Sequence, residues 1–330
     1  MKKTLVMLLA VAVVLSGVIG SISCSNEEDV PVAEQVTPNQ EAAALAALRQ
    51  EIMQLKQAET AKVDPQIRAG FFRKFVNYFK KVVFADAIGA LHGATLGSLV
   101  PGVGTVGGAL IGGVASSAVA AIPAVNRNIT ITPLNYLYFE TPAPLPVFND
   151  STISLGGGLV LGDPSCLTLS DSIGYYHNVA LLKLNEEHPD WLQLPAPTIV
   201  SNLTFQVEDV VGLSHGRLLS DSLNNNIQFQ TFNNNVISFY DETETYEEFV
   251  AMFKQSYPDL ADEIAVIEEF IDGFDDIDMI VTDQVVFSRK VLNLINNSEG
   301  LSDETKHALR SGVLVGNASA KLWNPEAFED

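Results

Sequence analysis

Apolar side chains recur at helical spacing through most of the chain. Over residues 40–61, for example, Leu45, Leu48 and Ile52 fall on one face of a helix, and Pro65 ends the segment. The same spacing, with polar caps at several starts, predicts further helices over residues 66–83, 82–99, 104–122, 173–185, 197–213, 245–257, 259–274, 277–296 and 302–323. Residues 224–235 are rich in Asn and too polar to bury, so we expect a loop there, with a short hairpin as the alternative. The pattern predicts a mainly α fold, a multi-helix bundle.

Residues 87–126 contain no Asp, Glu, Lys or Arg, and small residues recur at every fourth position within them. The small residues form two series, Gly89, Gly93 and Gly97, and then Gly104, Gly108, Gly112 and Ser116. A four-residue period places each series on one face of a helix, where the backbone of a second helix can approach closely. Pro101-Gly102 separates the two series. The sequence therefore predicts a glycine-zipper helical hairpin.

The predicted hairpin has two possible environments. Its helices would each span about 27 to 29 Å, close to the hydrocarbon thickness of a bilayer of about 30 Å. The abundant Gly, Ser and Thr, together with Asp86 and His92, weaken the apolar drive for insertion. An exported chain with two good membrane helices would also be retained in the inner membrane. We therefore expect a hairpin packed in a protein core or an assembly of copies, with bilayer insertion of residues 84–122 as the alternative.

The helix predicted over residues 66–83 is basic and aromatic, and it contains no acid. Its candidates for contact with a membrane surface are Arg68, Arg73, Lys74, Lys80 and Lys81. Basic amphipathic helices of this composition lie on anionic lipid. The alternative is an ordinary core helix whose basic face meets the acidic part of the chain.

Residues 127–165 differ from the rest. Short β-like runs such as residues 129–132 and 158–161 are separated by several prolines. Because proline cannot donate to a strand ladder, any strands here are short or at edges. We expect a minor extended segment that connects two helical parts.

The first 23 residues are typical of an export signal, with Lys2 and Lys3 ahead of a short apolar run. The lone Cys24 that follows resembles the lipid-attachment site of bacterial lipoproteins, although Ser21 replaces the usual Leu. Simple secretion after cleavage behind Ser23 is the alternative. The predicted organisation is a signal peptide (1–23), an acidic flexible tether (24–39), N-terminal helices and hairpin (40–125), a Pro-rich connector (126–170) and an acidic α-helical domain (171–330).

The charge is distributed unevenly. The 330 residues carry a net charge of −21, with a pI near 4.5. Up to residue 125 there are 10 basic and 9 acidic side chains, and from residue 126 there are 9 basic and 31 acidic ones. This strong negative charge makes nucleic acid an unfavourable partner, and the acidic part of the chain would repel anionic surfaces.

Three short segments resemble those of uncharacterised exported lipoproteins of the Bacteroidetes type. Residues 25–29 (Ser-Asn-Glu-Glu-Asp) place acids directly after the cysteine. Gly174, His177, Asn178 and Leu181 form a Gly-x-x-His-Asn-x-x-Leu segment, and residues 319–323 (Ser-Ala-Lys-Leu-Trp) form a small-aromatic ending. The resemblance implies an outer-membrane lipoprotein exposed at the cell surface, and it implies no activity.

Candidate chemistry is sparse. His177 and Asn178 are expected in a buried polar network, with a catalytic or ligand-contacting His177 as the alternative. The five histidines never adopt a zinc-binding spacing, and Cys166 has no base beside it, so we expect no metal, no cofactor and no catalytic residue.

These features favour a non-enzymatic, lipid-anchored protein of the cell envelope, anchored through Cys24, with a structural or interaction role and self-association through the hairpin as an option. The first alternative is a membrane-active, toxin- or bacteriocin-like protein that inserts residues 84–122. The second is an exported hydrolase that uses His177.

Overall fold

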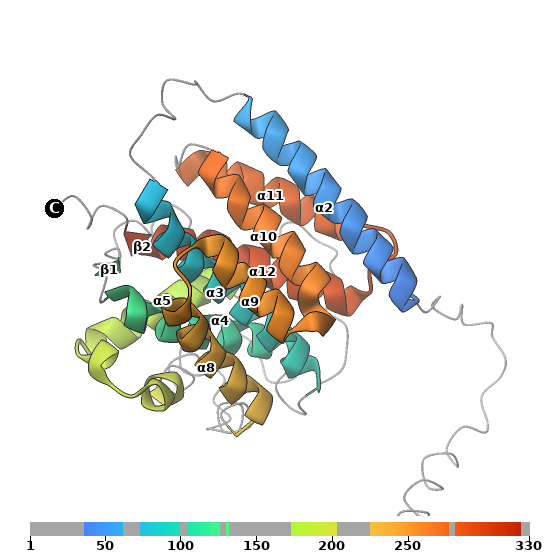
Figure 1. Cartoon of the computed structure of the whole chain (residues 1–330). Helices are drawn as coiled ribbons and strands as arrows, with labels where there is room; N and C mark the ends of the chain where they lie inside the picture. The colour runs from blue at the N-terminus through green and yellow to red at the C-terminus, as the bar shows by residue number, and fades with distance from the viewer. Residues whose placement is uncertain are drawn as a thin grey trace, which may run out of the picture. The chain divides into compact units, whose positions relative to one another are not determined.

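The computed structural model describes residues 36–61, 73–99, 104–125, 130–131, 173–202, 225–276 and 281–324. These residues are mainly helical, as predicted (Figure 1). The helices are α2 (Pro38–Thr60), α3 (Arg73–Leu99), α4 (Gly104–Val125), α5 (Ile173–Glu187), α8 (Ile227–Glu242), α9 (Tyr246–Ser256), α10 (Ala261–Asp276), α11 (Val281–Asn297) and α12 (Asp303–Leu322), with 3-10 turns η2 (Trp191–Gln193) and η3 (Pro258–Leu260). The two-residue strands β1 (Thr130–Ile131) and β2 (Trp323–Asn324) pair antiparallel. The predicted signal peptide, most of the tether and most of the connector lie outside the described residues.

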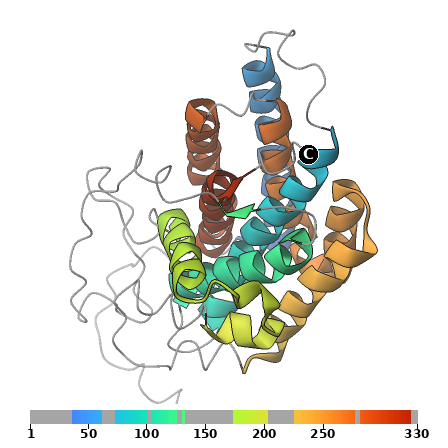
Figure 2. The same cartoon turned by 90° about the vertical axis from the view of Figure 1, so that its left-hand side faces the viewer.

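Helices α3 and α4 form the centre of this helical body. They pack along each other, and α5, α8 and α12 lie against them on different sides (Figure 2). Every residue from 79 to 94 and from 108 to 121 is buried. Most of the described part of the uncharged stretch is thus enclosed by helices from later in the chain.

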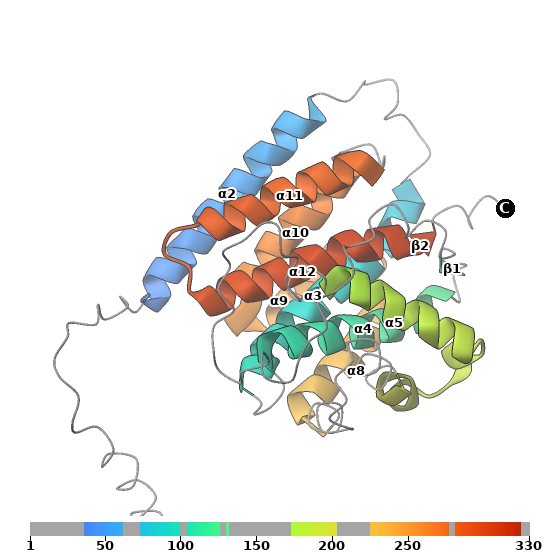
Figure 3. The ribbon, with the colours of Figure 1, turned by 180° about the vertical axis from the view of Figure 1, so that it is seen from behind.

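Helix α2 lies along α10 and α11 on the outside of this arrangement (Figures 1 and 3). It buries one apolar stripe, Leu45, Leu48 and Ile52, which matches the predicted helical face. Thr37 caps its first turn in a reciprocal capping box with Gln40, so its N-terminus is set by local chemistry.

The predicted break between a basic helix (66–83) and the first hairpin helix (82–99) is wrong. The described part of this region is one continuous helix, α3, from Arg73 to Leu99. The sequence between Lys81 and Phe84 contains no helix breaker, and the side chains on both sides of it face the same core. Residues 66–72 lie outside the described residues.

The predicted loop at residues 224–235 is also wrong, because most of it belongs to α8. Asn226 caps this helix by accepting hydrogen bonds from the backbone N–H groups of Gln228 and Phe229. Phe229, Phe232 and Val236 recur at helical spacing and are buried. Three core-facing apolar residues therefore outweigh the helix-disfavouring asparagines, one of which, Asn233, is itself buried.

The remaining C-terminal helices agree with the sequence prediction to within a few residues. Thr245 and Glu248 form a capping box at the start of α9, and Ser302 caps α12. Of the predicted helix at 197–213, residues 197–202 belong to a helix that begins at residue 196, and residues 203–213 lie outside the described part. Strong local caps explain why these starts could be located from sequence.

Candidate functional site

The backbones of α3 and α4 are in direct contact at their glycines. A Cβ atom on Gly93 would lie 2.2 Å from the carbonyl oxygen of Gly108, and one on Gly108 would lie 2.1 Å from the carbonyl oxygen of Gly93. The same relation holds one turn away, where a Cβ on Gly112 would lie 2.2 Å from the oxygen of Gly89. No L side chain fits at such distances, so this approach requires glycine.

The ends of the two small-residue series are less uniform. A Cβ on Gly89 would lie 2.1 Å from the hydroxyl of Ser116, and the Cα of Gly97 lies 2.7 Å from the position of a Cβ on Gly108. Gly104 is the first residue of α4. The glycine faces of the two helices are thus occupied by each other within one chain. A second copy could use them only if the hairpin opened.

Next to this contact, Asp86 of α3 is the centre of a buried polar cluster. Its Oδ2 accepts hydrogen bonds from Ser117 of α4 at 2.6 Å, from Ser319 of α12 at 2.5 Å and from the indole of Trp323 at 3.3 Å. Burial raises the pKa of Asp86 to about 7, against the opposing effect of these three donors. One carboxylate therefore connects the hairpin to the end of α12.

His177 and Asn178 of α5 complete the cluster. His177 Nδ1 lies 2.9 Å from Asn178 Oδ1, and Asn178 Nδ2 donates to the carbonyl oxygen of Ala318 at 2.9 Å. His177 Nε2 lies 3.8 Å from Asp86 Oδ2. Burial lowers the pKa of His177 to about 4, although Asn178 and the Gly113 carbonyl act in the opposite direction.

The cluster contains Ser, His and Asp, but its connections are not those of a hydrolase. A nucleophilic serine must hydrogen-bond to the histidine that takes its proton. Here Ser117 and Ser319 both donate to Asp86. Every residue of the cluster is at most 2% exposed, so a substrate could not reach these side chains. The arrangement can hold helices together and can bind a proton.

Sequence reasoning found only two members of this cluster, His177 and Asn178. Asp86 was expected only to weaken membrane insertion, and Ser319 and Trp323 only to form part of the C-terminal motif. Asp86 is the single acid between residues 65 and 126, which was the available signal that it needs partners. The positions of those partners in the sequence gave no such signal.

Two of the membrane-surface candidates face the protein interior. The Lys81 ammonium is buried, donates to the Thr243 carbonyl oxygen at 2.7 Å and lies 5.2 Å from the centre of the Tyr240 ring. Lys80 pairs with Asp272 of α10 at 2.6 Å. For these two residues the structure favours a basic face that meets the acidic helices. Arg73 and Lys74 belong to α3 but their side chains are not described, and Arg68 lies outside the described residues.

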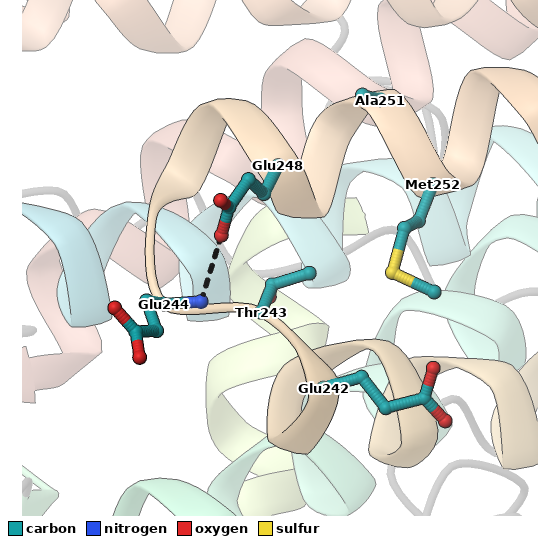
Figure 4. A pocket seen from close by; sticks show the side chains of 6 residues that line it. All are labelled: Glu242, Thr243, Glu244, Glu248, Ala251 and Met252. Atoms are coloured by element: carbon teal, nitrogen blue, oxygen red, sulfur yellow. Dashed lines mark hydrogen bonds between the residues drawn. The ribbon is translucent and has the colours of Figure 1, made fainter.

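A surface hollow at the turn between α8 and α9 is lined by Glu242, Thr243, Glu244, Glu248, Ala251 and Met252 (Figure 4). The Glu248 carboxylate accepts from the backbone N–H of Glu244 at 2.9 Å and of Thr245 at 3.2 Å, and these bonds lower its pKa. The carboxylate is thus part of the α9 cap. The hollow is best explained as the outer surface of a capped turn whose Thr243 carbonyl holds Lys81.

Two described helical segments, Asn77–Leu99 and Thr105–Pro123, are long and apolar enough to cross a membrane. In this fold 83% of the first apolar window and 78% of the second are buried by protein. Within the described ranges, no group of three or more His, Cys, Asp or Glu side chains could hold a metal ion.

Comparisons with known proteins do not extend this picture, since no protein-family model, no curated protein and no solved structure matches the chain. The candidate site therefore depends on the geometry of the buried cluster and the hairpin.

Proposed function

We propose that this protein is a non-enzymatic lipoprotein of the cell envelope, of the uncharacterised exported Bacteroidetes type, with a structural or interaction role. A signal peptide over residues 1–23 would export it, and lipid on Cys24 would hold it at the outer membrane. The observation that best supports this proposal is the enclosure of the apolar hairpin by helices from later in the chain.

Enclosure matters because it removes the need for lipid around the hairpin. Two apolar helices exposed to water would have to insert into a bilayer or aggregate. Here α5, α8, α10 and α12 cover them, and Lys80 pairs with Asp272 where the hairpin meets α10. A body of this kind folds in water and needs a separate anchor to stay at a membrane, which a lipid on Cys24 would supply.

The charge of the outer helices is consistent with this position. The part of the chain from residue 126 carries 9 basic and 31 acidic side chains, so it is repelled by anionic lipid. Such a body would remain beside the membrane and present its surface to partners in the surrounding medium.

Cell fractionation tests the anchor. Cys24→Ser should move the protein from the membrane fraction to the soluble fraction and abolish labelling by a fatty-acid analogue. Cys166→Ser is the matched control, because it removes the other cysteine and should change neither result. If Cys24→Ser protein stays in the membrane after washing with high salt and carbonate, something other than lipid on Cys24 anchors it.

A membrane-active protein is the second candidate, and one observation favours it. The hairpin helices contact each other through their own glycine backbones, so the pair could stay together if lipid replaced the surrounding helices. Release of dye from anionic vesicles by the mature Cys24→Ser protein would support this candidate. Intact vesicles, together with a hairpin that resists protease, would support the envelope protein.

A further inference from the structure

Several buried polar atoms of the described residues have no hydrogen-bond partner, and two of them belong to ionisable side chains that lie next to each other. These two atoms are Asp86 Oδ1 and His177 Nε2. The imidazole Nε2 lies 3.8 Å from the other carboxyl oxygen, and both side chains are fully buried. An unpaired buried acceptor is costly, so the site favours a proton on one of them.

The hydrogen bonds of Asn178 determine where His177 can take a proton. Because Asn178 Nδ2 donates to Ala318, its Oδ1 is the atom that faces His177 Nδ1. An amide oxygen only accepts, so Nδ1 must carry hydrogen. In the neutral imidazole Nε2, the nitrogen beside Asp86, then carries no hydrogen. The Gly113 carbonyl also interacts with this ring and favours its protonated form.

The hydrogen bonds of Asp86 determine which of its carboxyl oxygens can carry a proton. Its Oδ2 already accepts from Ser117, Ser319 and Trp323. A proton on the carboxyl group is therefore placed on Oδ1, where no hydrogen bond is lost. The two proton positions, Oδ1 of Asp86 and Nε2 of His177, are thus on neighbouring side chains, whose Oδ2 and Nε2 atoms lie 3.8 Å apart.

We propose that Asp86 and His177 share a single-proton site, and that its occupancy controls how firmly α5 and α12 dock on the hairpin. With one proton the site is neutral overall and suits the apolar core. Loss of that proton leaves a carboxylate beside a neutral imidazole, and addition of a second leaves an imidazolium beside a neutral carboxyl group. Either net charge in the core weakens the contact of three packed elements.

Among the described residues, His177 is the ionisable group that lies within 4 Å of the Asp86 carboxylate. Helix α4 has no ionisable side chain between residues 104 and 125. Of the described charged groups on α3 and α12, Lys80 pairs with Asp272 of α10, Lys81 with the Thr243 carbonyl, and Arg310 with Asn296 of α11. Glu304 accepts from Ser98, and Lys306 donates to the Asn296 carbonyl. The acids of α5, α8 and α9 are exposed: Glu186, Glu187, Asp241, Glu242, Glu247 and Glu248. Lys183 of α5 and Lys321 of α12 are half-buried. Tyr175 and Tyr176 of α5 pack edge to face with each other.

The directions of the pKa shifts agree with a single-proton state near neutral pH. Burial raises the pKa of Asp86 to about 7 and lowers that of His177 to about 4. Between these values the carboxyl group keeps its proton and the imidazole remains neutral. The fold is then weakened on the alkaline side by Asp86 and on the acid side by His177.

Unfolding equilibria of the mature chain, made soluble by Cys24→Ser, test the proposal. The isosteric Asp86→Asn variant removes the titration, so the ratio of the wild-type unfolding constant to that of the variant should rise by about tenfold or more between pH 5 and pH 8. For His177→Gln the corresponding ratio should rise by about tenfold or more as the pH falls from 7.5 to 5. The exposed controls Asp241→Asn and His188→Gln should show ratios that stay nearly constant over the same ranges.

A measurement on the wild-type core covers the case in which a core variant does not fold. Nitrogen-15 NMR of the His177 ring should show a neutral imidazole with hydrogen on Nδ1 from pH 5 to pH 7. An imidazolium at pH 7, or hydrogen on Nε2, would overturn the proposal. So would ratios for Asp86→Asn and His177→Gln that match those of the exposed controls.

Discussion

The carbonyl oxygen of Gly93 in α3 lies only 2.1 Å from the position that a Cβ atom on Gly108 of α4 would occupy. Backbone therefore meets backbone at the centre of the hairpin, and the neighbouring core is arranged around that contact. The buried carboxylate of Asp86 lies on the same helix, two turns before Gly93, and connects it to α12.

Gly108→Ala should lower the free energy of unfolding by about 3 kcal/mol, because the new methyl group meets backbone that cannot rotate away. Gly316→Ala is the matched control, since its Cβ would meet side-chain atoms at 3.2 to 3.3 Å. There the helix-favouring effect of Ala offsets the tight contact, and the change should stay below about 1 kcal/mol. Denaturant unfolding measures both variants. Equal effects would mean that the backbone contact is not what requires glycine.

Glu269→Gln should loosen α2 from the rest of the protein. Arg49 and Lys56 of α2 both bind the Glu269 carboxylate, at 2.9 and 3.2 Å, and Glu269 is buried. Since Arg49 is partly exposed, we expect a loss of about 2 kcal/mol, less than for a fully buried pair. Hydrogen exchange should accelerate in α2 and not in α4. Glu268→Gln, which affects only the pair with Lys254, should leave α2 unchanged.

Asn178→Ala should destabilise the core by about 2 kcal/mol, because it leaves the Ala318 carbonyl and His177 Nδ1 without their partner. The exposed Asn234→Ala variant on α8 should have little effect. Thermal unfolding measures the difference. In the same variant the His177 ring loses the acceptor that holds hydrogen on Nδ1, so its NMR signals should show both neutral tautomers.

Thr245→Ala should destabilise α9 by about 1 kcal/mol through loss of its N-cap. The Glu247→Gln control changes an exposed acid in the same turn without touching the cap. If Thr245→Ala costs no more than this control, the capping box does not stabilise the turn between α8 and α9. Urea unfolding monitored by circular dichroism is sufficient to compare them.

His92→Phe should make the protein less sensitive to acid. His92 stacks on Phe232 with ring centres 4.3 Å apart, and burial lowers its pKa from 6.5 to about 4. A histidine buried in its neutral form stabilises the fold above pH 6.5, and that stability is lost as the pH falls toward 4. The difference in melting temperature between pH 7 and pH 4.5 should therefore shrink in the variant. An unchanged difference would show that His92 does not titrate with unfolding.

Local patterns predicted the helices where spacing and capping agreed. Ser302 and Thr245 are polar caps followed by apolar residues at helical spacing, and α12 and α9 begin there. The prediction failed at α8, where asparagines suggested a loop while Phe229, Phe232 and Val236 formed a buried face. In that segment the composition favoured a loop and the apolar periodicity favoured a helix. The helix formed because it buries these apolar side chains.

The candidate site was harder to predict, because its members come from four separate parts of the chain. The motif around His177 indicated a buried polar group, but nothing local connected it with Asp86, Ser117 or Ser319. A side chain buried far from water must find its partner wherever another helix happens to approach. The spacing of residues along the sequence does not show which helices will approach each other.

The sequence by itself determined the helical periods, the caps and the uncharged glycine-rich stretch, because these depend on neighbours within a turn or two of the backbone. Only the tertiary structure decided that later helices cover most of the described part of this stretch, that Lys80 and Lys81 face inward, and that Asp86 lies beside His177. Those outcomes depend on which surfaces exclude water from one another, and this is a property of the whole packed chain.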